Sequence, residues 1–195
     1  ALLSSTLGLS VNIWLLSTAA LVTWFGSVLW YADRRLAGLS CCGVAATLCG
    51  FATIEFGEST IAQAGMQMLS GCLIGFTVNA MLLGHWYLVQ PGMPRKLINE
   101  IVDAVIYLWP LEVIALILPT GMISVLNGTI DDGWNGVLGW FWLASAIVTG
   151  VLALVTRAAL KERSYSAVMA ATGLMYLAIL TAFCTDIVAR ALLAA

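Results

Sequence analysis

The sequence has few charged residues, and this scarcity excludes most soluble folds. Of its 195 residues only 9% are charged, whereas 62% are hydrophobic. A soluble domain carries about 25% charged and about 45–50% apolar residues, because its surface must stay polar. A water-soluble fold of this size cannot bury so much apolar surface, so the expected solvent is a lipid bilayer. The few cations form no basic stretch, and we expect no nucleic-acid partner.

Motifs for catalysis and metal binding are also missing. The five cysteines form no CxxC or CxxCH pattern, and the single histidine, His85, excludes an HExxH site and a bis-histidine haem within the chain. The sequence contains no Walker A, GxGxxG or GxSxG loop, and no lysine lies inside an apolar run. We therefore assign no catalytic residue and no metal site, and we expect no enzymatic activity from the chain by itself.

The sequence does contain long apolar runs separated by short polar segments. A helix needs about 20 mainly apolar residues to cross the hydrocarbon core of a bilayer. We predict an all-α, polytopic integral membrane protein, with a single membrane domain over residues 1–195 that forms a six-transmembrane-helix bundle. The predicted spans are about 9–31, 36–54, 61–89, 104–126, 134–156 and 167–193.

The loops between these runs alternate in charge. Seven of the eight cations lie in the first, third and fifth loops, whereas the second and fourth loops contain acids and no cation. The exception, Arg190, lies four residues after Asp186, a spacing that suits an ion pair on a helix. The positive-inside rule then places the odd-numbered loops in the cytoplasm and both termini outside. We expect a bacterial inner membrane or an equivalent energy-transducing membrane.

The third predicted span carries a polar line along one face. Polar groups do not face lipid, so this line is expected to face another helix, a cavity or a neighbouring subunit. Helix packing is one interpretation, because Gly71 and Gly75 permit close approach of a second helix. A ligand or proton path is the other. The residues that fall within about 40° of one line at 100° per residue are Gln63, Gln67, Ser70, Thr77, Met81 and His85.

Two residues in the predicted spans are candidates for chemistry. His85 lies one turn from the cytoplasmic end of the third span, where an imidazole either binds haem, chlorophyll or quinone or forms an interfacial hydrogen bond. Glu112 lies near the middle of the fourth span, two residues after Pro110. A carboxyl at that depth must be neutral or partnered, so it marks a functional site or a hydrogen bond to a neighbouring helix. No cofactor is firmly implied.

Three classes of function fit these features. The first is a non-catalytic integral membrane subunit of a larger complex, such as a respiratory or photosynthetic electron-transfer assembly. The second is a small proton-coupled carrier or channel that uses Glu112 and the polar line of the third span. The third is a haem-, pigment- or quinone-binding protein that uses His85. The sparse polar content favours the first class, whose partners are the bilayer and other membrane subunits.

Overall fold

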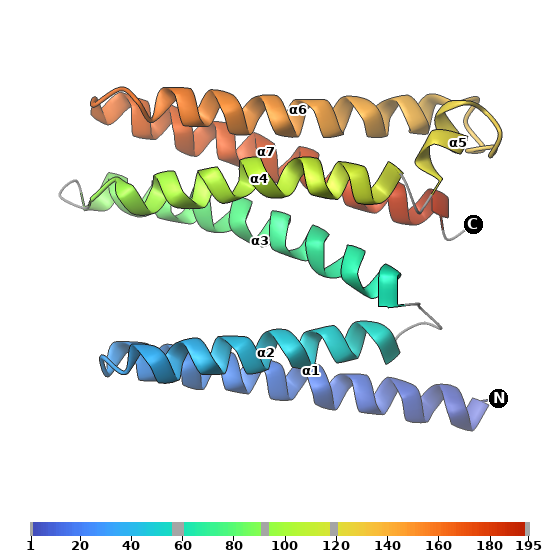
Figure 1. Ribbon diagram of the computed structural model, residues 1–195, viewed down its shortest axis with the longest axis horizontal. Coiled ribbons are helices and arrows are strands. Elements are labelled where there is room, and N and C mark those ends of the chain that lie inside the picture. The colour runs from blue at the N-terminus through green and yellow to red at the C-terminus, as the bar shows by residue number, and fades with distance from the viewer. Residues whose placement is uncertain (1, 56–60, 91–93, 118–120, 194–195) are drawn as a thin grey trace. The chain divides into compact units, whose positions relative to one another are not determined.

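A computed structural model describes residues 2–55, 61–90, 94–117 and 121–193 of the chain, and these residues form α-helices and turns without any strand. The prediction of an all-α fold is confirmed for this part of the chain. Its helices (Figure 1) are α1 (Leu2–Tyr31), α2 (Arg35–Glu55), α3 (Ile61–Val89), α4 (Lys96–Ile117), α5 (Met122–Leu126), α6 (Val137–Ala159) and α7 (Tyr165–Leu193).

Three of these helices contain segments that are long and apolar enough to cross a membrane. Within the described ranges, these segments are Gly65–Val89, Val137–Ala159 and Tyr165–Leu192. Two shorter apolar stretches, Ile13–Leu29 and Leu36–Ala52, lie in α1 and α2. The chain is therefore helical and compatible with a membrane, but its six predicted spans are not confirmed, and that number stays a prediction.

The fourth predicted span, 104–126, does not correspond to one helix. α4 begins earlier, at Lys96, and ends at Ile117 in the described part, whereas Met122–Leu126 form the separate helix α5. Gly121 precedes α5 with a φ of 76°, a left-handed conformation in which an α-helix does not continue. α4 also carries four charged residues, Lys96, Glu100, Asp103 and Glu112.

The fifth predicted span also begins later than expected, at Val137 instead of residue 134. The residues before α6 form a tight turn in which Gly133, Asn135 and Gly136 have φ values of 70°, 54° and 84°. A helix cannot include such residues, because an α-helix requires negative φ throughout. The other four predicted spans agree with α1, α2, α3 and α7 to within a few residues at the helix ends described, except that α1 begins earlier, at Leu2.

The described residues fall into two compact units, 1–68 and 69–195. In the first unit, α1 and α2 lie side by side as an antiparallel pair (Figure 1). Asp33 in the turn between them has a φ of 57°, a conformation that aspartate tolerates better than most residues. The helices approach closely at Gly26, where an added Cβ would lie 2.8 Å from the Cβ of Cys41.

The second unit packs α4, α6 and α7 with most of α3 around an apolar core. Small side chains let these helices approach one another. A Cβ at Gly84 of α3 would collide with the Thr172 hydroxyl of α7, and a Cβ at Gly150 of α6 would lie 2.6 Å from the Trp109 ring of α4. The core residues include Leu73 and Ala80 of α3, Val102 and Val105 of α4, Ala153 of α6, and Met175 and Ala178 of α7.

Two basic loops lie at the same end of this second unit. The Arg95 guanidinium, just before α4, donates hydrogen bonds to the Glu162, Arg163 and Ser164 carbonyls of the α6–α7 turn, at 2.5, 3.1 and 3.1 Å. Figure 1 shows the beginning of α4 and the α6–α7 turn at this end, and α5 at the opposite end. The third and fifth predicted loops therefore share one end, and the acidic fourth loop lies at the other.

Candidate functional site

The most unusual group in the second unit is the Glu112 carboxyl, on α4. It follows Pro110, which lies inside the helix and has no amide to donate. The Glu112 side chain is only 2% exposed, and its atom Oε1 has no hydrogen-bond partner among the described residues. A buried polar atom without a partner costs about 1–3 kcal/mol, so native proteins keep such atoms rarely and often at functional sites.

α3 supplies the hydrogen-bond partner of this carboxyl. Ser70 is 2% exposed and forms a side-chain hydrogen bond with Glu112. Thr77, on the same face of α3, is also fully buried, but its hydroxyl donates to the Leu73 carbonyl of its own helix at 2.7 Å. The Ser70 hydroxyl therefore links α3 to Glu112 on α4, whereas the Thr77 hydroxyl bonds only within α3.

α7 brings an ion pair to the same region. Arg190 Nε donates to Asp186 Oδ2 at 2.8 Å, which confirms the pairing expected from their spacing. Both groups are close enough to interact electrostatically with Glu112. The Asp186 side chain is 14% exposed, and its second oxygen, Oδ1, is buried without a partner among the described residues. We call Glu112, Ser70, Asp186 and Arg190 the acid cluster.

A third buried polar atom without a partner lies on α6, in the apolar cluster that adjoins the acid cluster. Trp142 on α6 is fully buried, and its Nε1 donates to no described group. Trp142 packs in one apolar cluster with Leu116 and Ala189, which are one turn beyond Glu112 and Asp186 on their helices. Among the described residues, the buried unpaired side-chain atoms of the molecule are Glu112 Oε1, Asp186 Oδ1 and Trp142 Nε1.

Two ion pairs lie at the basic end of the second unit instead. Arg157 Nε donates to Asp103 Oδ1 at 2.5 Å, and its Nη1 donates to Asn99 Oδ1 at 2.9 Å. Lys96 and Glu100 form an exposed pair at 3.6 Å. Arg157 therefore links α6 to α4, and this end of the unit is held together by its charged groups.

The structure does not gather Met81 and His85, the other predicted site residues of the second unit, around Glu112. Met81 packs against the apolar core, and His85 is exposed near the end of α3. Ser70 and His85 are separated by about 22 Å along α3, at 1.5 Å of rise per residue. Gln67 is half-buried and belongs to the first unit. Gln63 lies in the first turn of α3, and its side chain is outside the described set.

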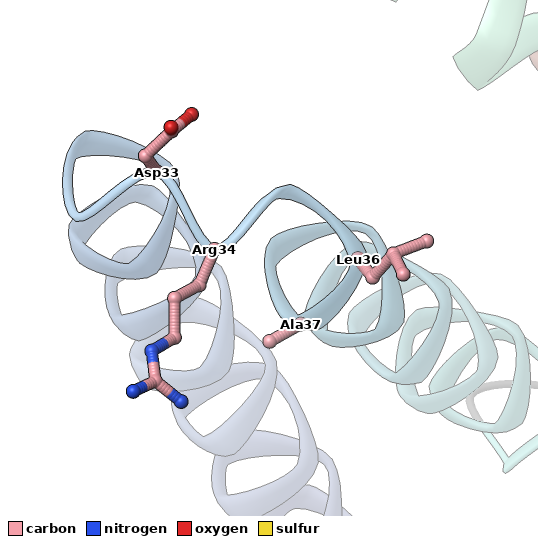
Figure 2. Close-up of a pocket in the computed structure, with 4 residues that line it drawn as sticks. All are labelled: Asp33, Arg34, Leu36 and Ala37. Atoms are coloured by element: carbon pink, nitrogen blue, oxygen red, sulfur yellow. The ribbon is translucent and has the colours of Figure 1, made fainter.

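Two other potential sites give no convergent group of side chains. The hollow at the α1–α2 turn is lined by Asp33, Arg34, Leu36 and Ala37, and Figure 2 shows these side chains pointing in different directions. In the part of the chain that the structure describes, no three His, Cys, Asp or Glu side chains are grouped as metal ligands would be.

Sequence reasoning identified Glu112 but did not connect it with Ser70 or with the α7 pair. Ser70 was predicted as part of the polar line, and Asp186 as the partner of Arg190. Their meeting depends on which faces of α3, α4 and α7 pack together, and no local signal in the sequence encodes that choice. Trp142 carried no signal at all, because tryptophan is common in membrane helices.

Comparison with known proteins finds no family model, no curated protein and no solved structure that matches this chain.

Proposed function

We propose that this protein is a small ion-coupled membrane carrier in which Glu112 is the ion-binding group. One observation carries the proposal: the Glu112 Oε1 atom is buried and unpaired where α3, α4 and α7 meet. Ionisable groups inside a membrane protein are costly, and they commonly mark ion pathways and proton relays. A group that only holds helices together would be expected to have both of its oxygens satisfied.

The proposal includes six membrane spans, with the odd-numbered loops in the cytoplasm and both termini outside. The basic α3–α4 and α6–α7 connections share one end of the second unit, which supports this orientation. On this topology Glu112 lies near mid-membrane. A binding site at that depth can be reached in turn from either side, as alternating access requires.

Transport by reconstituted protein tests this function. Proteoliposomes with imposed pH and sodium gradients are offered labelled amino acids, sugars, organic cations and organic anions in turn. We expect one class to accumulate above the level in empty vesicles, and Glu112→Gln to reduce that uptake at least about tenfold. Glu100→Gln, which changes an exposed acid on the same helix, should retain uptake. Unchanged transport by Glu112→Gln would remove this residue from the mechanism.

A second candidate function is that of a non-catalytic membrane subunit of an electron-transfer complex. The observation that favours it is Asn79, an exposed amide in the middle of α3 that donates to the Gly75 carbonyl at 2.8 Å. A polar side chain on the outside of a membrane helix favours contact with protein over contact with lipid. Such a subunit could hold haem, chlorophyll or quinone through His85, which is also exposed.

Purification in mild detergent distinguishes the two candidates. If the protein is a subunit of a larger complex, it should purify together with other proteins in fixed proportions. If it also binds a cofactor through His85, the complex should show a haem or chlorophyll absorption band that disappears in His85→Ala. A colourless monomer that transports a solute would refute this reading and leave the carrier.

A further inference from the structure

The three unpaired buried atoms of the second unit, two in the acid cluster and one in the apolar cluster that adjoins it, differ in hydrogen-bonding character. Glu112 Oε1 and Asp186 Oδ1 are carboxyl oxygens, which accept hydrogen bonds when ionised. Trp142 Nε1 is an indole nitrogen, which can only donate. A ligand that satisfies all three must therefore accept one hydrogen bond and donate two.

A water molecule meets this requirement. Its oxygen accepts from the indole, and its two hydrogens reach the two carboxyl groups. A sodium or potassium ion accepts no hydrogen bond, so it would leave the indole unpaired and place a positive charge near the N–H dipole. The unpaired donor at Trp142 therefore favours a ligand that accepts a hydrogen bond over a bare metal cation.

The charges of the cluster favour one additional positive charge there. In the part of the chain that the structure describes, the titratable and charged groups that interact with Glu112 are Asp186 and Arg190, both on α7. α3 contributes the neutral Ser70, and α6 contributes the neutral Trp142 to the adjoining apolar cluster. With both acids ionised, the cluster would hold two negative charges against one guanidinium. In an apolar surrounding such an excess is costly, and one bound proton removes it.

We propose that the coupling ion of this protein is a proton, held by Glu112 and Asp186 through one water molecule that Trp142 orients. The proton is taken from water on one side of the membrane by a carboxylate, which becomes a neutral acid, and is returned to water on the other side. The inference deepens the proposed carrier function and rests on it for its use in transport.

Infrared spectroscopy of the purified protein tests the proton directly and needs no transported solute. At neutral pH we expect a carboxylic acid C=O band that shifts in D₂O and disappears in Glu112→Gln. Glu100→Gln should retain the band, because that acid is exposed and paired with Lys96. Trp142→Phe removes the donor that orients the water, so the band should shift in frequency. Absence of any such band from the wild type at neutral pH would overturn the proposal.

Sodium provides the opposing test. Replacing choline chloride with sodium chloride at constant ionic strength should leave both the acid band and the melting temperature unchanged. Loss of the band, or a melting temperature that rises with sodium in the wild type and not in Glu112→Gln, would show a metal cation at the acids. If Trp142→Phe does not fold, the infrared and sodium results on the wild type and Glu112→Gln still decide. Absence of uptake with an intact acid band would refute the carrier alone, because these readouts do not depend on transport.

Discussion

Asp132, before α6, is a residue whose carboxylate organises a whole turn. Its Oδ1 accepts hydrogen bonds from the Trp134 and Gly136 amides at 2.9 and 2.8 Å, and its Oδ2 accepts from the Leu138 amide at 2.9 Å. Amides at the start of a helix have no partner within the helix, and Gly136 has no side chain to cap them. The hydrogen bond from Gly136 above all, aided by the other amides, holds the pKa of Asp132 below its usual range.

We predict that Asp132 makes the stability of the protein depend on acid pH. A carboxyl with a lowered pKa in the folded state stabilises the fold above its unfolded pKa of about 3.9. That contribution is lost as the pH falls through the lower, folded value. Asp132→Asn keeps one acceptor oxygen but turns an amide toward the Leu138 N–H. At neutral pH this variant should melt several degrees below the wild type in detergent, and the difference should shrink as the pH falls below about 4.

Asp131→Asn is the matched control for this prediction. Asp131 is exposed and accepts one hydrogen bond, from the Gly133 amide at 2.9 Å. The Asp131→Asn substitution should change the melting temperature little at any pH. If the difference in melting temperature between the wild type and Asp132→Asn stays constant from neutral to acid pH, the stabilisation does not depend on the negative charge of the Asp132 carboxylate.

At the scale of helices, the second unit is held together where large and small side chains meet. Trp109 of α4 lies against Gly150 of α6, and its indole donates to the Ala146 carbonyl at 2.7 Å. Thr149 of α6 donates to the Thr181 hydroxyl of α7 at 2.8 Å. Close backbone approach and interhelical hydrogen bonds are the main sources of association between membrane helices, since apolar side chains gain little by leaving lipid.

We predict that Gly150→Ala destabilises the contact between α4 and α6. The new Cβ would lie 2.6 Å from two ring carbons of Trp109, and the indole hydrogen bond to Ala146 prevents the ring from moving freely. Such overpacking costs about 1–3 kcal/mol, which thermal melting in detergent can detect. Combining this change with Trp109→Leu should recover part of the loss, because the smaller side chain leaves room for the methyl group.

Gly173→Ala is the control for that substitution. No atom lies within 4 Å of a Cβ at this position of α7, and alanine has the higher helix propensity, so the melting temperature should hold or rise. An equal loss in both variants would mean that glycine is needed for helix flexibility and not for the contact with Trp109.

The sequence allowed most helices to be predicted, because apolar length and flanking charges are local properties. It did not reveal where α4 ends or where α6 begins. These limits depend on left-handed residues such as Gly121 and Gly136 and on the amides gathered by Asp132. The acid cluster was predictable only in part. Glu112 is conspicuous as an acid in an apolar run, but its contact with Ser70 depends on how α3 and α4 pack.

At the scale of the whole molecule, the distribution of charge bears on how the chain crosses a membrane. Exposed cations such as Arg34 in the α1–α2 turn and Arg163 in the α6–α7 turn belong to odd-numbered loops. Asp131 belongs to the even-numbered fourth loop, between α5 and α6. Figure 1 shows α5 at the end of the second unit opposite the α6–α7 turn. With six spans, positions 34 and 163 lie on one side of the membrane and position 131 lies on the other. An odd number of crossings between positions 34 and 163 would instead put these two positions on opposite sides.

We predict that accessibility labelling in cells will follow the six-span pattern. The chain is first freed of its five thiols, so that labelling reports only the introduced cysteine. Single cysteines at 34 and 163 should then resist a membrane-impermeant maleimide until the membrane is opened, and a cysteine at 131 should react at once. Labelling of 34 and 163 from opposite sides would refute six spans. Labelling of both from outside, with position 131 protected, would keep the spans but reverse the orientation, against the positive-inside rule. A reversed orientation would also exchange the two ends of the second unit between the sides of the membrane, and with them the entry and exit routes of the proton proposed for Glu112.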